Sequence, residues 1–109
     1  NSICLMAEKA GRAAGYILAY RAADEAEIAR MAVAKELQRQ GVARALLDDF
    51  ESVCRAQEIN KLLLDVRSGN MAARALYEKS GFQEDGIRQR FYRDPEEDAV
   101  LMSKAIRGN

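Results

Sequence analysis

Apolar and polar side chains alternate with a period of two along three segments near the start of the chain. Such alternation predicts β-strands that present one face to a core. The segments are separated at residues 9–12 and 24–25, where glycine or acidic residues favour turns. We expect the first two segments to pair as a hairpin. The three predicted strands cover residues 2–7, 13–20 and 27–33.

The period changes to three or four residues after residue 41, which predicts an amphipathic helix over residues 42–58. Its apolar positions are Val42, Ala45, Leu46, Phe50, Val53 and Cys54. Its other face carries Arg44, Asp48, Glu51 and Arg55, which we interpret as a solvated charged face.

The second half of the chain predicts a strand, a short helix and two final strands. Three consecutive leucines within residues 61–66 favour a strand that is covered on both faces. Asn70 is a suitable N-cap for a helix that ends near residue 79, and Gly81 suits the left-handed position just beyond its C-terminus. The final strands cover residues 83–90 and 98–105, with Phe91 and Tyr92 in the loop between them.

This order of elements, β-β-β-α-β-α-β-β, predicts an α/β fold in a single domain over residues 1–109. The strand–helix–strand unit between residues 27 and 66 requires a parallel strand pair, because a helix returns the chain to the starting end of the sheet. The other strands are expected to be antiparallel. The sequence therefore predicts a mixed, mostly antiparallel sheet with helices on its faces.

Composition narrows the range of functions. Seventeen basic residues balance seventeen acidic ones among 109, and no basic block stands out, so we expect no nucleic-acid partner and no membrane partner. The chain has no histidine, which excludes histidine bases and nearly all zinc chemistry, and we expect no metal. Cys4 and Cys54 lie far apart on apolar-patterned segments. We interpret both as small buried residues in a reducing, cytoplasmic compartment.

The strongest candidate for a ligand site is the turn before the first helix, Gln38-Arg39-Gln40-Gly41-Val42-Ala43-Arg44. Glycine lets the backbone approach a ligand, and the first amides of the helix are unpaired donors that favour a phosphate. Arg39 and Arg44 add positive charge. Neither the P-loop motif nor the dinucleotide-binding glycine motif is present. A plain loop that enters a surface helix is the alternative that the sequence leaves open.

The pattern Gln-x-x-Gly-x-Ala with flanking arginines resembles the pyrophosphate-binding turn of the GNAT acyltransferases, which bind acyl-coenzyme A. Further matches lie at residues 31–33, 64–70, 75–82, 86–92 and 97–102, so the resemblance covers nearly the whole chain. The last two stretches favour the RimI branch, whose members acetylate the N-terminal alanine of a ribosomal protein. The resemblance implies a GNAT-like fold with a strand and two helices ahead of residue 1. We therefore expect the chain to be incomplete at its N-terminus.

The resemblance also implies which residues bind acetyl-CoA. Backbone groups of Met31, Ala32 and Val33 would pair with the pantetheine amides as an added strand would. Asn70 would hydrogen-bond the pantetheine arm, although simple N-capping explains this residue equally well. The glycine turn would hold the pyrophosphate through its amides, and it comprises Arg39, Gln40, Gly41, Val42, Ala43 and Arg44.

Asp65 and Tyr77 are the catalytic residues that the resemblance implies. Asp65, where RimI-like proteins usually carry Glu, would take a proton from the amine, and its place inside an apolar strand suits a base. Tyr77 would protonate the leaving thiolate. The alternatives are an ion pair of Asp65 with Arg67 or another arginine, and a packing role for Tyr77. Phe91 and Tyr92 would line the substrate entrance, or else pack on the family's N-terminal helices.

The sequence thus predicts an acetyl-CoA-dependent enzyme that acetylates a protein N-terminal amine, which the RimI resemblance narrows to the alanine of a ribosomal protein. One alternative is a GNAT enzyme that acts on another small-molecule amine or on lysine. Another is an acyl-CoA-binding module without turnover. Because residues 2–7 would form an edge of the sheet, we also expect self-association through that edge.

Overall fold

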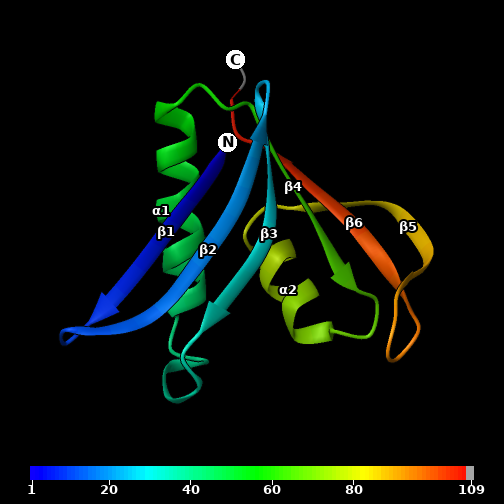
Figure 1. The fold of residues 1–109 in the computed structure, drawn as a ribbon, viewed down its shortest axis with the longest axis horizontal. Helices are drawn as coiled ribbons and strands as arrows, with labels where there is room; N and C mark the ends of the chain where they lie inside the picture. The colour runs from blue at the N-terminus through cyan, green and yellow to red at the C-terminus, as the bar shows by residue number, and fades with distance from the viewer. Residues whose placement is uncertain (108–109) are drawn as a thin grey trace.

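The computed structural model describes residues 1–107, which form one six-stranded sheet, two α-helices and a short 3-10 helix (Figure 1). The strands follow the order β1-β2-β3-β4-β6-β5 across the sheet. β3 and β4 are parallel, and every other neighbouring pair is antiparallel. The predicted mixed α/β fold is therefore confirmed.

The first three strands form an antiparallel meander, as the alternating pattern predicts. They are β1 (Ser2–Lys9), β2 (Arg12–Ala22) and β3 (Glu25–Val33), each slightly longer than expected. The turn between β1 and β2 uses Gly11 at a φ of 78°, a left-handed conformation that glycine adopts without strain. β1 has a strand partner on one side only, so it is an edge of the sheet. Self-association through this edge stays a prediction.

α1 (Val42–Ala56) connects β3 to β4 (Lys61–Arg67), and these two strands are parallel as the connection requires. A single 3-10 turn, η1 (Lys35–Leu37), precedes α1 and has no counterpart in the predicted elements. α1 ends earlier than predicted, because Glu58 takes a left-handed φ of 62° that a helix cannot accommodate. Within residues 1–107, no helix is long and apolar enough to cross a membrane.

α2 (Met71–Lys79) follows β4, and the signals at its two ends are confirmed. Asn70 accepts a hydrogen bond from a first-turn N–H at 3.2 Å, and Gly81 lies just beyond the helix at a φ of 99°. The chain ends in a hairpin of β5 (Gln83–Tyr92) and β6 (Glu97–Ala105). β6 lies between β4 and β5, so the last strand in the chain is an inner strand of the sheet.

Both helices pack on the same face of the sheet. Lys104 of β6 shows this, because its ammonium group donates to the carboxylate of Glu51 in α1 at 2.5 Å and to the carbonyl of Ser80, just beyond α2, at 2.6 Å. The core lies between this face and the helices. Its large buried side chains include Ile17, Leu46, Phe50, Ile59, Leu62, Val100 and Met102.

Two expectations about burial are wrong, because the described helices cover only one face of the sheet. β4 is not enclosed on both faces: Leu62 and Leu64 are buried, whereas Leu63 is half-buried. Cys4 alternates with the core-facing residues of β1 and is exposed. Cys54 is buried as expected, and burial raises the pKa of its thiol to about 11.

The charged face of α1 is also less solvated than expected. The Glu51 side chain is 12% exposed and forms salt bridges with both Arg55 and Lys104. Arg44 and Asp48 lie on the exposed part of this face, as predicted, and form a salt bridge at 3.5 Å. The Glu51 network therefore ties α1 to β6 at the rim of the core.

β3 and β4 separate after four residue pairs, the last of which is Ile28↔Leu64. Ala29 is then an extra residue in β3, because neighbouring residues of β2 pair with Ile28 and Arg30. Such a bulge bends a strand and increases its local twist. Beyond the bulge the two strands diverge, which opens the sheet between them (Figure 1).

Replacing Phe50 with alanine should destabilise the protein by about 3–5 kcal/mol, because the change removes a fully buried ring and leaves a cavity between α1 and the sheet. Urea denaturation followed by circular dichroism measures the free energy of unfolding. Phe91→Ala is the matched control, because Phe91 is 40% exposed and its truncation should cost far less. Equal losses in the two variants would contradict this placement of the core.

Candidate functional site

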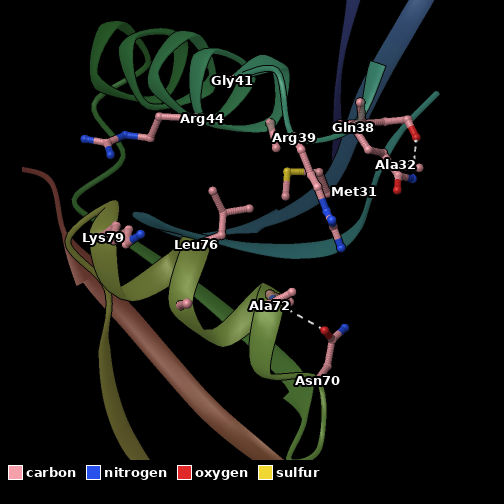
Figure 2. A pocket seen from close by; sticks show the side chains of 14 residues that line it. Met31, Ala32, Gln38, Arg39, Gly41, Arg44, Asn70, Ala72, Leu76 and Lys79 are labelled. Carbon is pink, nitrogen blue, oxygen red and sulfur yellow. Dashed lines mark hydrogen bonds between the residues drawn. The ribbon is translucent and has the colours of Figure 1, made fainter. Parts of the chain in front are cut away.

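A groove of about 570 Å³, which we call the long groove, runs between the second half of β3, the start of α1 and α2. Figure 2 shows the turn before α1 on one side of it and α2 on the other. The groove opens where β3 and β4 have separated. Its lining includes most of the residues that the sequence singles out as a cofactor site: Met31, Ala32, Val33, Arg39, Gly41, Ala43, Arg44 and Asn70.

The turn before α1 has the backbone geometry of an anion site. Arg39 and Gly41 adopt left-handed conformations, with φ of 65° and 82°. Gly41 is the N-cap of α1, and no side chain caps the helix. The first N–H groups of α1 therefore have no capping side chain as a partner, and they lie at the positive end of the helix dipole. A Cβ at Gly41 would meet no atom within 4 Å, so the space at the turn is open to a ligand.

The backbone of residues 31–33 has a strand partner on one side only. These residues pair with β2, whereas the pairing of β3 with β4 ends before them, at Ile28. The side-chain NH₂ group of Gln38 donates to the backbone carbonyl of Val33 at 3.2 Å. An extended ligand could pair with the rest of this edge as a further strand would.

Positive side chains lie at both ends of the long groove. Arg39 lies near Met31 at one end, and Arg44 and Lys79 lie at the other (Figure 2). Between these ends α2 contributes small or apolar side chains, Ala72, Ala73, Ala75 and Leu76. The sequence-based set lacks Lys79 and this wall of α2, because helical periodicity alone does not tell which face of a helix borders a groove.

A second cavity of about 350 Å³, which we call the inner pocket, lies between the diverging ends of β3 and β4. It shares Met31, Asn70 and Ala73 with the long groove, so the two cavities adjoin, and we call them together the cleft. Both predicted catalytic residues are in this pocket. Its polar lining comprises Arg30, Asp65, Arg67, Asn70, Tyr77 and Tyr92.

Asp65 is not paired with a positive side chain. Within residues 1–107 its carboxylate takes part in no salt bridge, so the alternative of an ion pair with Arg67 is wrong. The guanidinium of Arg67 pairs instead with Glu97 at 3.2 Å and lies 4.5 Å from the centre of the Tyr92 ring. Asp65 is half-buried, so its carboxylate is accessible from the inner pocket.

Burial raises the pKa of both phenols of the inner pocket, Tyr77 and Tyr92. It raises the pKa of Tyr77, whose side chain is 8% exposed, and the neighbouring Tyr92 adds a smaller contribution. The pKa of Tyr92 is also raised, first by burial and then by the carboxylate of Asp65. Both tyrosines are therefore hydrogen-bond donors at neutral pH. Tyr77 also packs edge-on against Phe82, with ring centres 5.6 Å apart, so packing and donation coexist.

Some predicted site residues lie elsewhere than expected. Phe91 and Tyr92 are not in a loop but at the end of β5, because the hairpin pairing extends to Tyr92. Tyr92 lines the inner pocket, whereas Phe91 lines neither cavity. Gln40 and Val42 also line neither cavity. The side-chain NH₂ group of Gln40 donates instead to the backbone carbonyl of Glu36 at 3.0 Å.

The cleft therefore combines backbone amides with positive charge, a free strand edge, and a pocket with a carboxylate and two protonated phenols. This combination suits an elongated ligand that carries phosphate at one end and amides along its length. The carboxylate and the phenols suit a reaction that moves protons at the other end. Among residues 1–107, no three Cys, Asp or Glu side chains lie close enough to hold a metal ion.

Comparison with known proteins agrees with this geometry. The model of the Acetyltransferase (GNAT) family matches residues 1–82, which include the glycine turn, both helices and Asp65. The chain belongs to the GNAT acetyltransferase family. The expected fold and the resemblance on which it was based are thereby confirmed.

The similar proteins include bacterial enzymes of one specificity. The ribosomal protein bS18-alanine N-acetyltransferase of Escherichia coli is 39% identical over 98 residues, which cover 88% of this chain and 66% of that protein. The crystal structure of an E. coli ribosomal-protein-S18-alanine N-acetyltransferase has a TM-score of 0.92 at 34% identity, covering 99% of this chain and 71% of that one. The chain thus spans slightly less than two thirds of the curated relative.

A further structure shares the fold at lower identity. A GNAT family acetyltransferase from Elizabethkingia anophelis, solved with acetyl-CoA bound, has a TM-score of 0.87 at 24% identity. The match covers 94% of this chain and 74% of that one.

The Gly41→Val variant should bind coenzyme A roughly tenfold more weakly or worse, the equivalent of one lost charge-assisted hydrogen bond. A β-branched residue is strained at a φ of 82° and fills the open space at the turn. Isothermal titration calorimetry measures the affinity. Gly11→Val is the matched control, because Gly11 has a φ of 78°, equally open surroundings and a place on the distant β1–β2 turn. Unchanged affinity in a folded Gly41→Val variant would refute the anion site.

Proposed function

We propose that this chain transfers the acetyl group of acetyl-CoA to the N-terminal amine of a protein. One observation carries the proposal: the gap between β3 and β4 joins the long groove, with its free amides and positive charge, to the pocket that holds Asp65 and Tyr77. A cofactor held in the groove would thereby reach the two groups that can move protons.

In the long groove, each part of acetyl-CoA would have contacts of its own. The amides of the turn around Gly41 would hold the pyrophosphate, with Arg39 and Arg44 adding charge. The free edge of residues 31–33 would bond to the pantetheine amides. Asn70 uses its side-chain oxygen to cap α2, so its NH₂ group is the part that would serve the same arm.

Acetyl-CoA supplies a thioester, whose carbonyl carbon forms a bond to the amine nitrogen while the carbon–sulfur bond breaks. Asp65 would take the proton that the amine nitrogen must lose, directly or through one water. Its freedom from any described ion pair supports this role. Tyr77 would give its phenolic proton to the leaving thiolate, and the raised pKa of the phenol keeps that proton in place beforehand.

An N-terminal alanine is the acceptor that the relatives support. The curated E. coli relative, at 39% identity, is named for acetylation of alanine on ribosomal protein bS18. In this chain Tyr92 would border the acceptor, because it shares the inner pocket with Asp65. Phe91, which lines neither cavity, would contribute only at the outer rim.

Incubation with acetyl-CoA and an alanine-initiated peptide should release free thiol and add one acetyl group to the peptide. The same peptide with a blocked N-terminus is the control and should release none. Ellman's reagent measures the thiol, and mass spectrometry locates the acetyl group. Transfer only to lysine or to a small amine would replace the proposed acceptor. Binding of acetyl-CoA without thiol release would instead identify a non-catalytic acyl-CoA-binding module.

Asp65→Asn should lower kcat by roughly 10²–10⁴-fold, the usual cost of losing a general base, with little change in coenzyme A affinity. Asp65→Glu should retain activity, because the carboxylate remains. Asp49→Asn, on the exposed side of α1, is the matched control and should behave as wild type. Normal turnover by Asp65→Asn would show that the base is elsewhere or that water serves alone.

A further inference from the structure

Arg67 lies where its guanidinium could pair with Asp65 and prevent that carboxylate from acting as a base. The two residues are two positions apart on β4, so their side chains leave the same face of the sheet. A guanidinium so close to a carboxylate would hold it in an ion pair and disfavour proton uptake. In the structure, the guanidinium of Arg67 bonds to other groups instead. It donates to the carbonyls of Pro95 at 3.1 Å and Arg93 at 3.3 Å, and to the carboxylate of Glu97 at 3.2 Å.

The second carboxylate oxygen of Glu97 accepts hydrogen bonds from the turn between β4 and α2. That oxygen accepts the backbone N–H of Gly69 at 2.6 Å and the hydroxyl of Ser68 at 3.5 Å. The N–H of Gly69 and the guanidinium of Arg67 lower the pKa of Glu97, so the carboxylate stays charged. A Cβ on Gly69 would lie 2.7 Å from the same oxygen. A side chain at residue 69 would therefore displace the Glu97 carboxylate.

The contacts of Arg67 and Glu97 join the turn before α2 to the β5–β6 hairpin, and both segments adjoin residues that line the inner pocket, Asn70 and Tyr92. The turn at Gly69 leads directly into Asn70, which lines both cavities. The loop after β5 follows Tyr92, which is the last residue of β5 and pairs with Glu97 of β6. The β5–β6 register shifts between Arg88 and Tyr92, and the guanidinium of Arg67 lies 4.5 Å from the centre of the Tyr92 ring, which adds a side-chain contact to this end of the ladder.

We propose that Arg67 and Glu97 form a positioning pair for the reaction pocket. Glu97 fixes the turn that carries Asn70 and holds Arg67 over the ring of Tyr92. In doing so it keeps the guanidinium away from Asp65. This role rests on the proposed acetyl transfer, and the pair itself touches neither reacting group. Other charged or titratable groups that line the same pocket are Arg30 of β3 and Tyr77 of α2.

The test is Glu97→Gln in the intact chain, which keeps the shape and an acceptor for Gly69 but loses the charge that holds Arg67. We expect kcat with acetyl-CoA and an alanine-initiated peptide to fall roughly 10- to 100-fold, the scale of a small misplacement in an active site. The Kd for acetyl-CoA should stay within about twofold, because the variant keeps an acceptor for the N–H of Gly69 and so keeps the turn that carries Asn70. Glu96→Gln is the matched control, since Glu96 pairs with Arg90 at 3.3 Å on the exposed surface.

A double-mutant cycle separates positioning from general damage. If the two residues act as a unit, Arg67→Met/Glu97→Gln should lose no more kcat than the poorer single variant. Thermal melting confirms that each variant is folded. If Glu97→Gln proves unfolded, Arg67→Lys gives the same test, because it keeps the charge but loses the planar donor fork.

The possible outcomes are distinct. Losses that add independently, or a loss that appears equally in the Kd for acetyl-CoA, would overturn the positioning role. A wild-type kcat in Glu97→Gln would overturn it as well, while leaving the proposed function standing. A wild-type chain without turnover would overturn the proposed function, and this role with it.

Discussion

The cleft exists because two parallel strands stop pairing after four residues. A sheet that kept its register would satisfy the backbone of residues 31–33 with the neighbouring strand and leave no edge for a ligand. The bulge at Ala29 prevents this, because one extra residue bends β3 away from β4. Unpaired backbone in the interior of a sheet is unfavourable unless something else bonds to it. The separation therefore both opens the cleft and provides the groups that a strand-like ligand would use.

The same separation brings together side chains from the two faces of the sheet. Tyr77 comes from a helix on the covered face, whereas Asp65 alternates with the buried residues Leu64 and Val66 and so belongs to the opposite face. They share one pocket only because the sheet is open between them. In an unbroken sheet the two groups would be divided by a layer of backbone, and neither would reach a common reacting atom.

Two charged networks hold parts of the fold that lie far apart in sequence. Lys104 and Glu51 connect β6 to α1, and Arg67 and Glu97 connect the end of β4 to the start of β6. Partly exposed ion pairs contribute little free energy each. Their effect here is geometric, since each fixes one element against another where hydrophobic packing ends. Lys104 does so at the rim of the core, and Arg67 at the rim of the inner pocket.

The order and type of the elements followed from periodicity, because alternation and helical spacing report directly which residues face a core. The glycine turn, the Asn70 cap and the left-handed Gly81 were also predictable, since each depends on backbone chemistry within a few residues. Family resemblance then directed attention to Asp65 and Tyr77. The placement of Phe91 and Tyr92 was not predictable, because a hairpin's length depends on how its strands pair.

Only the tertiary structure decided which surfaces meet. Nothing local to β4 indicates that neither described helix covers its second face. That depends on both helices packing against the same face of the sheet. The absence of an ion pair at Asp65 among the described residues was likewise undetermined, because Arg67 lies two residues from Asp65, whereas Glu97, which pairs with Arg67, is thirty residues from Arg67. The sequence by itself determined the elements and the chemistry available to them. The partners of each charged group were decided by contacts between segments that only folding brings together.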